Sequence, residues 1–107
     1  MLRIVEVWLE VLRGLRGLIE QIERHDGDLA RQLRRSGPSV ALNTAEGSGV
    51  RGKNRGNCYA IALGEARETR TCLQVAVAFG YIAAIDPAVE KGIDHTIGTL
   101  VKVIRRG

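Results

Sequence analysis

Apolar residues recur every three or four positions through most of this chain, and that spacing constrains the fold more than any other feature. The most regular row begins the chain and contains Val5, Leu9, Leu12, Leu15, Ile19 and Ile22, with Trp8 beside them. Similar rows follow, and together the segments cover roughly residues 4–24, 29–45, 57–79 and 87–104. No segment alternates apolar and polar residues as a half-buried strand does. The sequence therefore predicts four helices and no sheet.

The segments between the rows carry the residues that begin and end helices. Residues 25–28 form a predicted turn, in which Asp26 or Asp28 can accept hydrogen bonds from the first N–H groups of the second helix. Gly80 is suited to end the third helix. The aspartate and proline at positions 86–87 suit the cap and the first helical position of the fourth.

Two features disturb the second helix. Pro38 lacks an N–H group and its ring clashes with the preceding turn, so we expect it to kink or split the helix. Residues 47–56 contain four glycines and no apolar periodicity, which predicts a loop. The third helix should then begin near Asn54 or Asn57.

The first helix carries a second apolar row, so its apolar face is wider than one core contact needs. This row consists of Ile4, Val7, Val11, Gly14 and Leu18. Either the helix lies deep in the bundle, or it also packs against another subunit.

A chain of 107 residues buries a single core, so we expect one domain over residues 1–107. Helices joined by short connections run antiparallel, which predicts an up-down-up-down antiparallel four-helix bundle. The first seven residues place charges at both ends of a short apolar run, unlike a signal peptide. No stretch approaches the ~20 apolar residues that span a bilayer. We therefore expect a cytoplasmic protein with no membrane segment.

Cys58 and Cys72 are the only thiols. On one helix their 14-residue separation corresponds to ~21 Å, too far for a disulfide. His25 and His95 are isolated in the sequence and lack the spacing of metal ligands. We predict neither a metal site nor a cofactor.

The net charge of +4 is concentrated in the middle of the chain. Residues 1–28 hold four basic and six acidic groups, residues 29–64 six and one, and residues 65–107 six and five. A concentrated basic patch can neutralise several phosphates, so the middle segment predicts salt-dependent affinity for RNA or DNA. Its basic residues are Arg31, Arg34, Arg35, Arg51, Lys53 and Arg55, opposed only by Glu46.

An alternative explanation of these arginines is structural. They can pair with Glu65 and Glu68 of the third helix, or with acidic groups of another subunit. The sequence leaves both interpretations open.

Residues 47–53 match the Gly-x-x-x-x-Gly-Lys spacing of a nucleotide-binding loop. Asn54 stands where that loop needs serine or threonine to reach magnesium, and the segment follows a helical row instead of a strand. The serines at positions 36, 39 and 48 have no base close in the sequence. We predict that the protein is not an enzyme.

Several blocks of the chain resemble a family of bacterial four-helix bundle proteins first noticed as products of intervening sequences in large-subunit ribosomal RNA genes. The accessory variability proteins of diversity-generating retroelements look like members of the same family. The resemblance rests on Leu29–Arg35, on Ser39-Val40 followed by Asn43–Gly47, and on Ile61–Gly64 with Glu68, and more weakly on Val7-Trp8 and Gly80-Tyr81.

The resemblance implies a bundle that assembles as a ring-shaped homopentamer, without enzymatic activity. In the retroelement branch it implies binding of a reverse transcriptase and nucleic acid. It places Arg34 and Arg35 in the basic stretch, and Asn43 and Glu46 as polar anchors near the end of the second helix. It makes Gly47 the C-cap of that helix and Glu68 a further polar position. For Asn43 we favour a structural role, with its side chain satisfied by the backbone.

Two hypotheses follow. The first is a homo-oligomeric adaptor whose basic middle segment contacts RNA, DNA or a nucleic-acid enzyme such as a reverse transcriptase. The second is a purely structural or protein-interaction oligomer whose arginines are used in salt bridges.

Overall fold

The computed structural model describes residues 2–49 and 53–106, and the side chains of residues 3–49 and 54–106. Within these ranges the backbone forms four helices and no strand. The all-α prediction is confirmed. The helices are α1 (Leu2–Glu23), α2 (Gly27–Gly49), α3 (Lys53–Ala78) and α4 (Pro87–Arg106).

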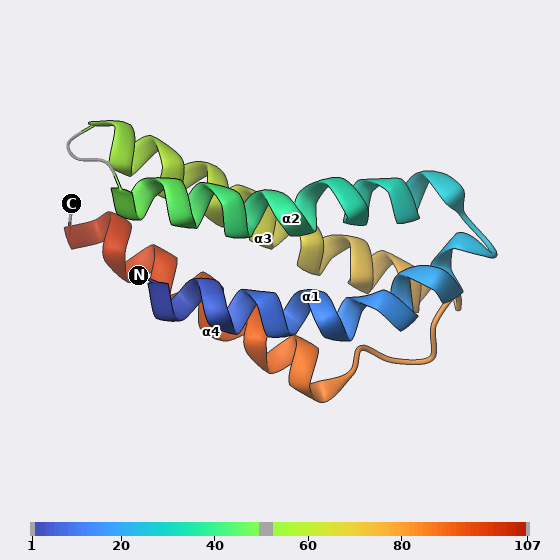
Figure 1. Cartoon of the computed structure of the whole chain (residues 1–107). Helices are drawn as coiled ribbons and strands as arrows, with labels where there is room; N and C mark the ends of the chain where they lie inside the picture. The colour runs from blue at the N-terminus through green and yellow to red at the C-terminus, as the bar shows by residue number, and fades with distance from the viewer. Residues whose placement is uncertain (1, 50–52, 107) are drawn as a thin grey trace.

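The four helices form an elongated up-down-up-down bundle of 42 × 23 × 19 Å (Figure 1). Each helix packs against the next in the sequence, and α4 packs against α1, which closes the ring of four. The start of α1, the end of α2, the start of α3 and the end of α4 therefore lie at one end of the bundle.

The core takes residues from both predicted rows of α1, with Leu15 and Ile22 from the first and Ile4 and Val11 from the second, whereas Leu9 of the first row is exposed. Trp8 of α1 is completely buried, and its indole Nε1 donates a 2.7 Å hydrogen bond to the carbonyl oxygen of Gly37 in α2. A buried indole needs such a partner because an unsatisfied N–H is costly in the interior. The other large side chains with almost no exposure are Leu15 and Ile22 of α1, Leu33 and Val40 of α2, Leu73 of α3, and Ile93 and Leu100 of α4.

The predicted helix ends are present. Asp26 Oδ1 accepts a 2.9 Å hydrogen bond from the backbone N–H of Leu29 and caps α2. Asp86 Oδ1 accepts bonds of 2.8 and 3.3 Å from the N–H groups of residues 88 and 89 and caps α4. Gly80 follows α3 with a φ of 76°, and the N–H groups of residues 80 and 81 bond to the carbonyls of residues 77 and 76. This is the double hydrogen bond of a Schellman end.

The second helix differs from its prediction. Pro38 does not split α2, which is continuous from Gly27 to Gly49. The proline ring lies on the exposed side of the helix, where the backbone bond that it removes can be replaced by water.

The predicted loop over residues 47–56 is wrong at both ends, although the expected start of the third helix near Asn54 agrees with the structure to within one residue. Gly47 is buried inside α2 and is not its C-cap, and α3 already begins at Lys53. A Cβ atom at position 47 would lie 2.6 Å from Cε1 of Tyr59, so glycine is needed there for close approach of α2 and α3. The centre of the predicted loop, residues 50–52, lies outside the described residues.

Within the described part of the chain, no helix combines the length and the apolar character required to cross a membrane.

Candidate functional site

The described residues of the predicted basic stretch lie in two separate places. Arg31, Arg34 and Arg35 are exposed on the first half of α2. Arg35 is level with Glu65 of α3, whereas Arg55 lies ten residues earlier on that helix, ~15 Å away along its axis. Of the other predicted basic residues, Arg51 and the side chain of Lys53 lie outside the described residues.

The three arginines of α2 each have an acidic partner in the same chain. Arg31 pairs with Asp28 one turn earlier at 2.7 Å, and Arg34 pairs with Glu23 of α1 at 2.8 Å. Arg35 bridges to two carboxylates of α3. It reaches Glu65 at 2.8 Å and also pairs with Glu68.

Ion pairing shifts the pKa values of Arg34, Arg35 and Glu23. The hydrogen bonds that Arg35 donates to Glu68 and to Glu65 raise the pKa of Arg35, and the bond that Arg34 donates to Glu23 raises the pKa of Arg34. The same bond lowers the pKa of Glu23. In the Arg34–Glu23 pair both partners thus favour the charged form. Ion pairs hold α2 to α1 through Arg34 and to α3 through Arg35.

These contacts still leave the arginines accessible. Exposed ion pairs contribute only about 0–1 kcal/mol because water and salt screen them. A guanidinium in such a pair can exchange its carboxylate for a phosphate at little cost, and its planar fork suits either partner.

The predicted polar anchors differ in their surroundings. Asn43 is half-buried, and its Nδ2 donates to the carbonyl oxygen of Ser39 at 2.9 Å and to the Ser39 hydroxyl at 3.0 Å. Its side chain therefore bonds within its own helix. Glu46 is exposed, and no described residue bonds its carboxylate. Glu68 is half-buried and pairs with Arg35.

A buried polar contact between α2 and α3 was not anticipated from the sequence. The hydroxyl oxygens of Ser36 and Thr69 are 2.9 Å apart, and both residues are fully buried. Because the Thr69 hydroxyl donates to the carbonyl oxygen of Glu65 at 2.9 Å, the Ser36 hydroxyl donates to Thr69. The only signal in the sequence is that both residues occupy core positions of apolar rows.

The second apolar row of α1 packs against α4 through two reciprocal contacts. Val89 of α4 lies over Gly14, where an added Cβ would come within 3.0 Å of its methyl group. Val11 of α1 lies over Gly92, where the corresponding distance is 2.5 Å. Of the two explanations for this row, packing within the bundle accounts for these residues.

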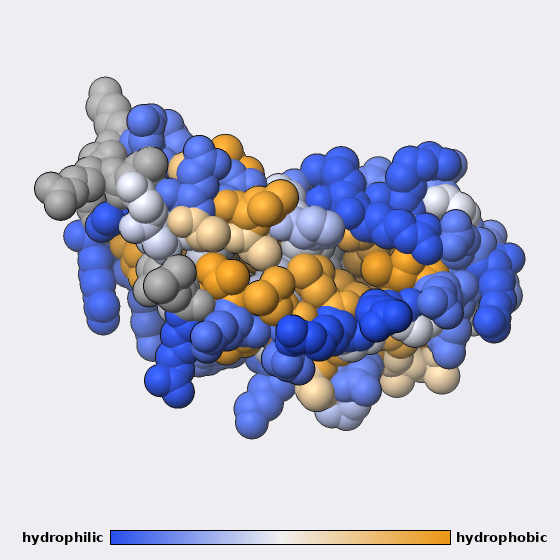
Figure 2. Space-filling view, in the orientation of Figure 1, coloured by the Kyte–Doolittle hydropathy of each residue, from blue (hydrophilic) through white to orange (hydrophobic). Residues whose placement is uncertain are grey.

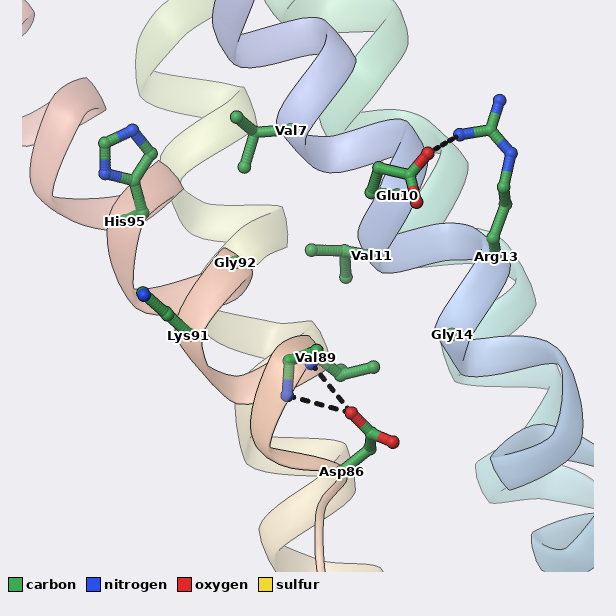
Figure 3. A pocket seen from close by; sticks show the side chains of 11 residues that line it. Val7, Glu10, Val11, Arg13, Gly14, Asp86, Val89, Lys91, Gly92 and His95 are labelled. Carbon is green, nitrogen blue, oxygen red and sulfur yellow. Dashed lines mark hydrogen bonds and ion pairs between the residues drawn. The ribbon is translucent and has the colours of Figure 1, made fainter.

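Next to these contacts, on the outside of the bundle, α1 and α4 border a groove of about 780 Å³. Figure 3 shows Val7, Val11 and Val89 between the two helices, and Lys91 and His95 on α4 at the border of the groove. On the α1 side, Glu10 is paired with Arg13.

The surface between α1 and α2 is apolar and partly exposed. Leu9 of α1 is 38% exposed and Leu42 of α2 is 69% exposed, and a groove of about 320 Å³ between these helices is lined by Leu12, Ile19 and Pro38, among others. Figure 2 shows an apolar band along the middle of the molecule, over α1 and α2. We call this surface the apolar stripe, formed by Leu9, Leu12, Ile19, Pro38 and Leu42.

No group of three potential metal ligands occurs in the described part of the chain. Cys58 and Cys72 both lie on α3 as free thiols, and burial raises the pKa of Cys72. The hydroxyl of Ser36 bonds Thr69, that of Ser39 accepts from Asn43, and that of Ser48 bonds the carbonyl of Thr44. In these contacts each serine has a structural partner.

A sequence model of the family described as "23S rRNA-intervening sequence protein" matches residues 5–101. The chain belongs to this family. The match spans all four helices and includes every block on which the resemblance rested, so that resemblance is confirmed.

A solved structure supports the same fold. It is a Bacteroides thetaiotaomicron protein described as having unknown function and as coming from the S23 ribosomal protein family. The two chains share 23% identity, superpose with a TM-score of 0.78, and align over 94% of this chain and 97% of the other. A comparison with curated proteins finds no match.

The family match therefore covers the surfaces described above almost completely. The arginines of α2, the apolar stripe and the groove between α1 and α4 all lie within residues 5–101. Residues 2–4 of α1 and the last five described residues of α4, which include Lys102, Arg105 and Arg106, fall outside it.

Proposed function

We propose that this member of the 23S rRNA-intervening sequence protein family is a cytoplasmic, non-enzymatic adaptor. It assembles with copies of itself, as a ring-shaped homopentamer by its family resemblance, and holds RNA, DNA or a nucleic-acid enzyme such as a reverse transcriptase. Two free thiols on one helix are typical of a protein in a reducing compartment.

The apolar stripe is the observation that carries self-assembly. Leu42 leaves 69% of its surface in water, and neighbouring apolar residues of α1 and α2 extend the exposed area. Covering a leucine side chain contributes about 1.5–3 kcal/mol, so a second copy placed on the stripe removes a substantial hydration cost. A contiguous exposed apolar area is typical of an interaction surface.

The nucleic-acid part of the proposal rests on charge. The net charge is +4 and the isoelectric point is about 9.6, and the arginines of α2 are accessible despite their ion pairs. Several copies in one ring would bind the same nucleic acid at once, so even weak contacts would add to strong attachment.

The second candidate is a purely structural oligomer. The bridge from Arg35 to Glu65 and Glu68 favours it, because this arginine already joins α2 to α3. In that case the arginines are needed for the bundle and its assembly, and nucleic acid plays no part.

Self-assembly is tested by measuring molar mass with light scattering on a sizing column. We expect the wild type to elute as an oligomer and Leu42→Glu as a monomer with unchanged helical content. Phe79→Glu is the matched control, because Phe79 is 70% exposed but lies beyond the end of α3 and outside the stripe. A monomeric wild type, or an oligomer that tolerates Leu42→Glu, contradicts the proposed assembly.

The two candidates are separated by Arg34→Glu/Arg35→Glu. Binding to structured RNA and duplex DNA is measured across a salt series, together with molar mass and thermal unfolding. The adaptor loses nucleic-acid affinity while its assembly remains. The structural oligomer loses stability or assembly and shows no nucleic-acid affinity in either form.

A further inference from the structure

One face of α4 carries basic residues at helical spacing. Lys91, His95, Lys102 and Arg106 follow at intervals of four, seven and four residues, which places them along one side of the helix. All four are exposed. From the first to the last they span fifteen residues, or ~22 Å of helix. We call these four residues the α4 basic row.

Between His95 and Lys102 the surface of the row is open. Gly98 occupies the position between His95 and Lys102, and an added Cβ there would meet nothing within 4 Å. A helix-interior glycine costs about 1 kcal/mol relative to alanine, and packing within this chain does not explain this one. A ligand lying along the row could approach the helix backbone closely at this position.

The row differs from the arginines of α2 in lacking acidic partners. Among the described residues, no carboxylate lies within ion-pair distance of Lys91, Lys102 or Arg106. Asp94 of the same helix is directed to Arg70 of α3, 3.5 Å away. Across the groove, Glu10 is paired with Arg13 of α1 (Figure 3).

Structural roles account for only part of the row. Arg106 and its neighbour Arg105 lie in the last turn of α4, where positive charge is favoured by the helix dipole. Lys91 lies near the opposite, positive end of the same dipole, where a cation gains nothing. His95 and Lys91 border the groove instead of filling it.

Other basic residues extend the row toward the adjacent helix. Arg3, near the start of α1, lines a small cavity of about 160 Å³ together with His95 and Thr99 of α4. Arg105 is exposed beside Arg106. The positive surface therefore continues from the α4 basic row onto the start of α1.

We propose that the α4 basic row binds the phosphate backbone of a nucleic acid. A straight row ~22 Å long matches a linear polyanion, because duplex DNA carries one charge per ~1.7 Å of its length. The row contains no phenylalanine, tyrosine or tryptophan on which successive bases could stack, so we place the contact with the backbone, independent of sequence. The proposal rests on the nucleic-acid part of the proposed function and adds a contact on α4 to that of the α2 arginines.

The test compares two double charge reversals that change the net charge equally. Lys102→Glu/Arg106→Glu alters the row. Arg24→Glu/Arg67→Glu alters two exposed arginines on the turn after α1 and on α3, and serves as the control. Fluorescence anisotropy with a labelled duplex DNA and a structured RNA measures affinity between about 50 and about 200 mM salt.

We expect the row variant to lose at least about tenfold in affinity at the lowest salt, and its slope of log K against log salt to shrink by about two. The control should stay within about threefold of the wild type. Equal losses in both variants would show attraction by net charge alone and would overturn the proposal. Retained affinity in the row variant would overturn it as well.

Three further arms complete the design. Lys91→Gln/His95→Gln removes the other half of the row without adding acid, and should weaken binding less than the reversal while leaving helical content unchanged. If Arg34→Glu/Arg35→Glu abolishes binding and the row variants do not, nucleic-acid binding is supported and the α4 site is wrong. If the wild type binds no nucleic acid, both the nucleic-acid function and the α4 site are wrong. If polyglutamate displaces the nucleic acid at equal charge, the partner is an acidic protein segment and the proposal is wrong.

Discussion

The interface between α2 and α3 and the interface between α1 and α4 are built by different means. Between α2 and α3, the hydroxyl oxygens of the buried residues Ser36 and Thr69 are 2.9 Å apart, and Arg35 bridges to two half-buried carboxylates of α3. Between α1 and α4, the described residues make no hydrogen bond or ion pair. Two valines lie instead over the glycines at positions 14 and 92 of the opposite helix.

The difference shows that separate contacts set the register of α2 along α3 and the distance between α1 and α4. A buried hydrogen bond is satisfied at one relative position of two helices, so Ser36 and Thr69 fix how α2 slides along α3. Valine over glycine sets how closely two helices approach, since the side chain needs the space that a Cβ would occupy. The first interface adds directional contacts to the close approach at Gly47, whereas the second depends on shape alone.

The largest expected effect breaks the interface between α2 and α3. In Gly47→Val, the new side chain meets Tyr59, which is only 3% exposed and has no space to move into. We expect a loss of about 3 kcal/mol in the free energy of unfolding, measured by urea denaturation. The control is Gly64→Val on the outer side of α3, where an added Cβ meets nothing within 4 Å. Similar losses at both positions would contradict the role of Gly47.

A smaller effect is expected between α1 and α4. Gly14→Ala forces Val89 away, and the better helix propensity of alanine offsets part of the cost, which leaves a net loss of about 1 kcal/mol. Adding Val89→Ala makes room for the new methyl group, so the double variant should be more stable than the sum of the single changes by about 1 kcal/mol. Thermal and urea unfolding of the four proteins measure this coupling.

A control for the second prediction lies on the same helix. Gly17 has nothing within 4 Å of an added Cβ, so Gly17→Ala should stabilise the protein by up to about 1 kcal/mol. If changes at Gly14 and Val89 prove additive, the two residues do not set the distance between α1 and α4.

The smallest effects, of about 1 kcal/mol or less, concern the buried hydroxyls. Ser36→Ala should cost about 1 kcal/mol, because Thr69 keeps its bond to the Glu65 carbonyl and is not left unsatisfied. Thr96→Val on α4 is the matched case, since this buried threonine bonds only the Gly92 carbonyl of its own helix. We expect a change within about 0.5 kcal/mol there. A larger loss at Thr96 than at Ser36, in the same urea titrations, would reverse the contrast between the interfaces.

Most of the fold could be predicted because helix spacing and helix ends are local properties of the sequence. The apolar rows depend only on residues three or four apart, and Asp26, Gly80 and Asp86 act on groups within a few positions. Gly47 was misassigned because glycine is a poor helix former, whereas Tyr59, twelve residues later, decides its environment. Pro38 does not split α2, because its ring lies on the side of the helix that faces water.

The candidate sites were harder to predict because they depend on residues from different helices. Glu65 and Glu68 were identified as alternative partners for the arginines, but Glu23, the partner of Arg34, was not. The α4 basic row was hidden by the balanced charge of residues 65–107, whose acidic groups lie partly on other sides of the helices. Counting charge along the sequence cannot separate the faces of a helix.

The order of the helices around the ring has a consequence for how the chain folds. Three of the four neighbouring pairs join helices that are consecutive in the sequence, whereas α1 and α4 come from opposite ends of it. Local hairpins close short loops and form quickly, but bringing α1 to α4 means closing a loop of nearly the whole chain. We expect this pairing to be completed last and to open first, so backbone amides of α4 should exchange with solvent hydrogen before those in the centre of α2 and α3.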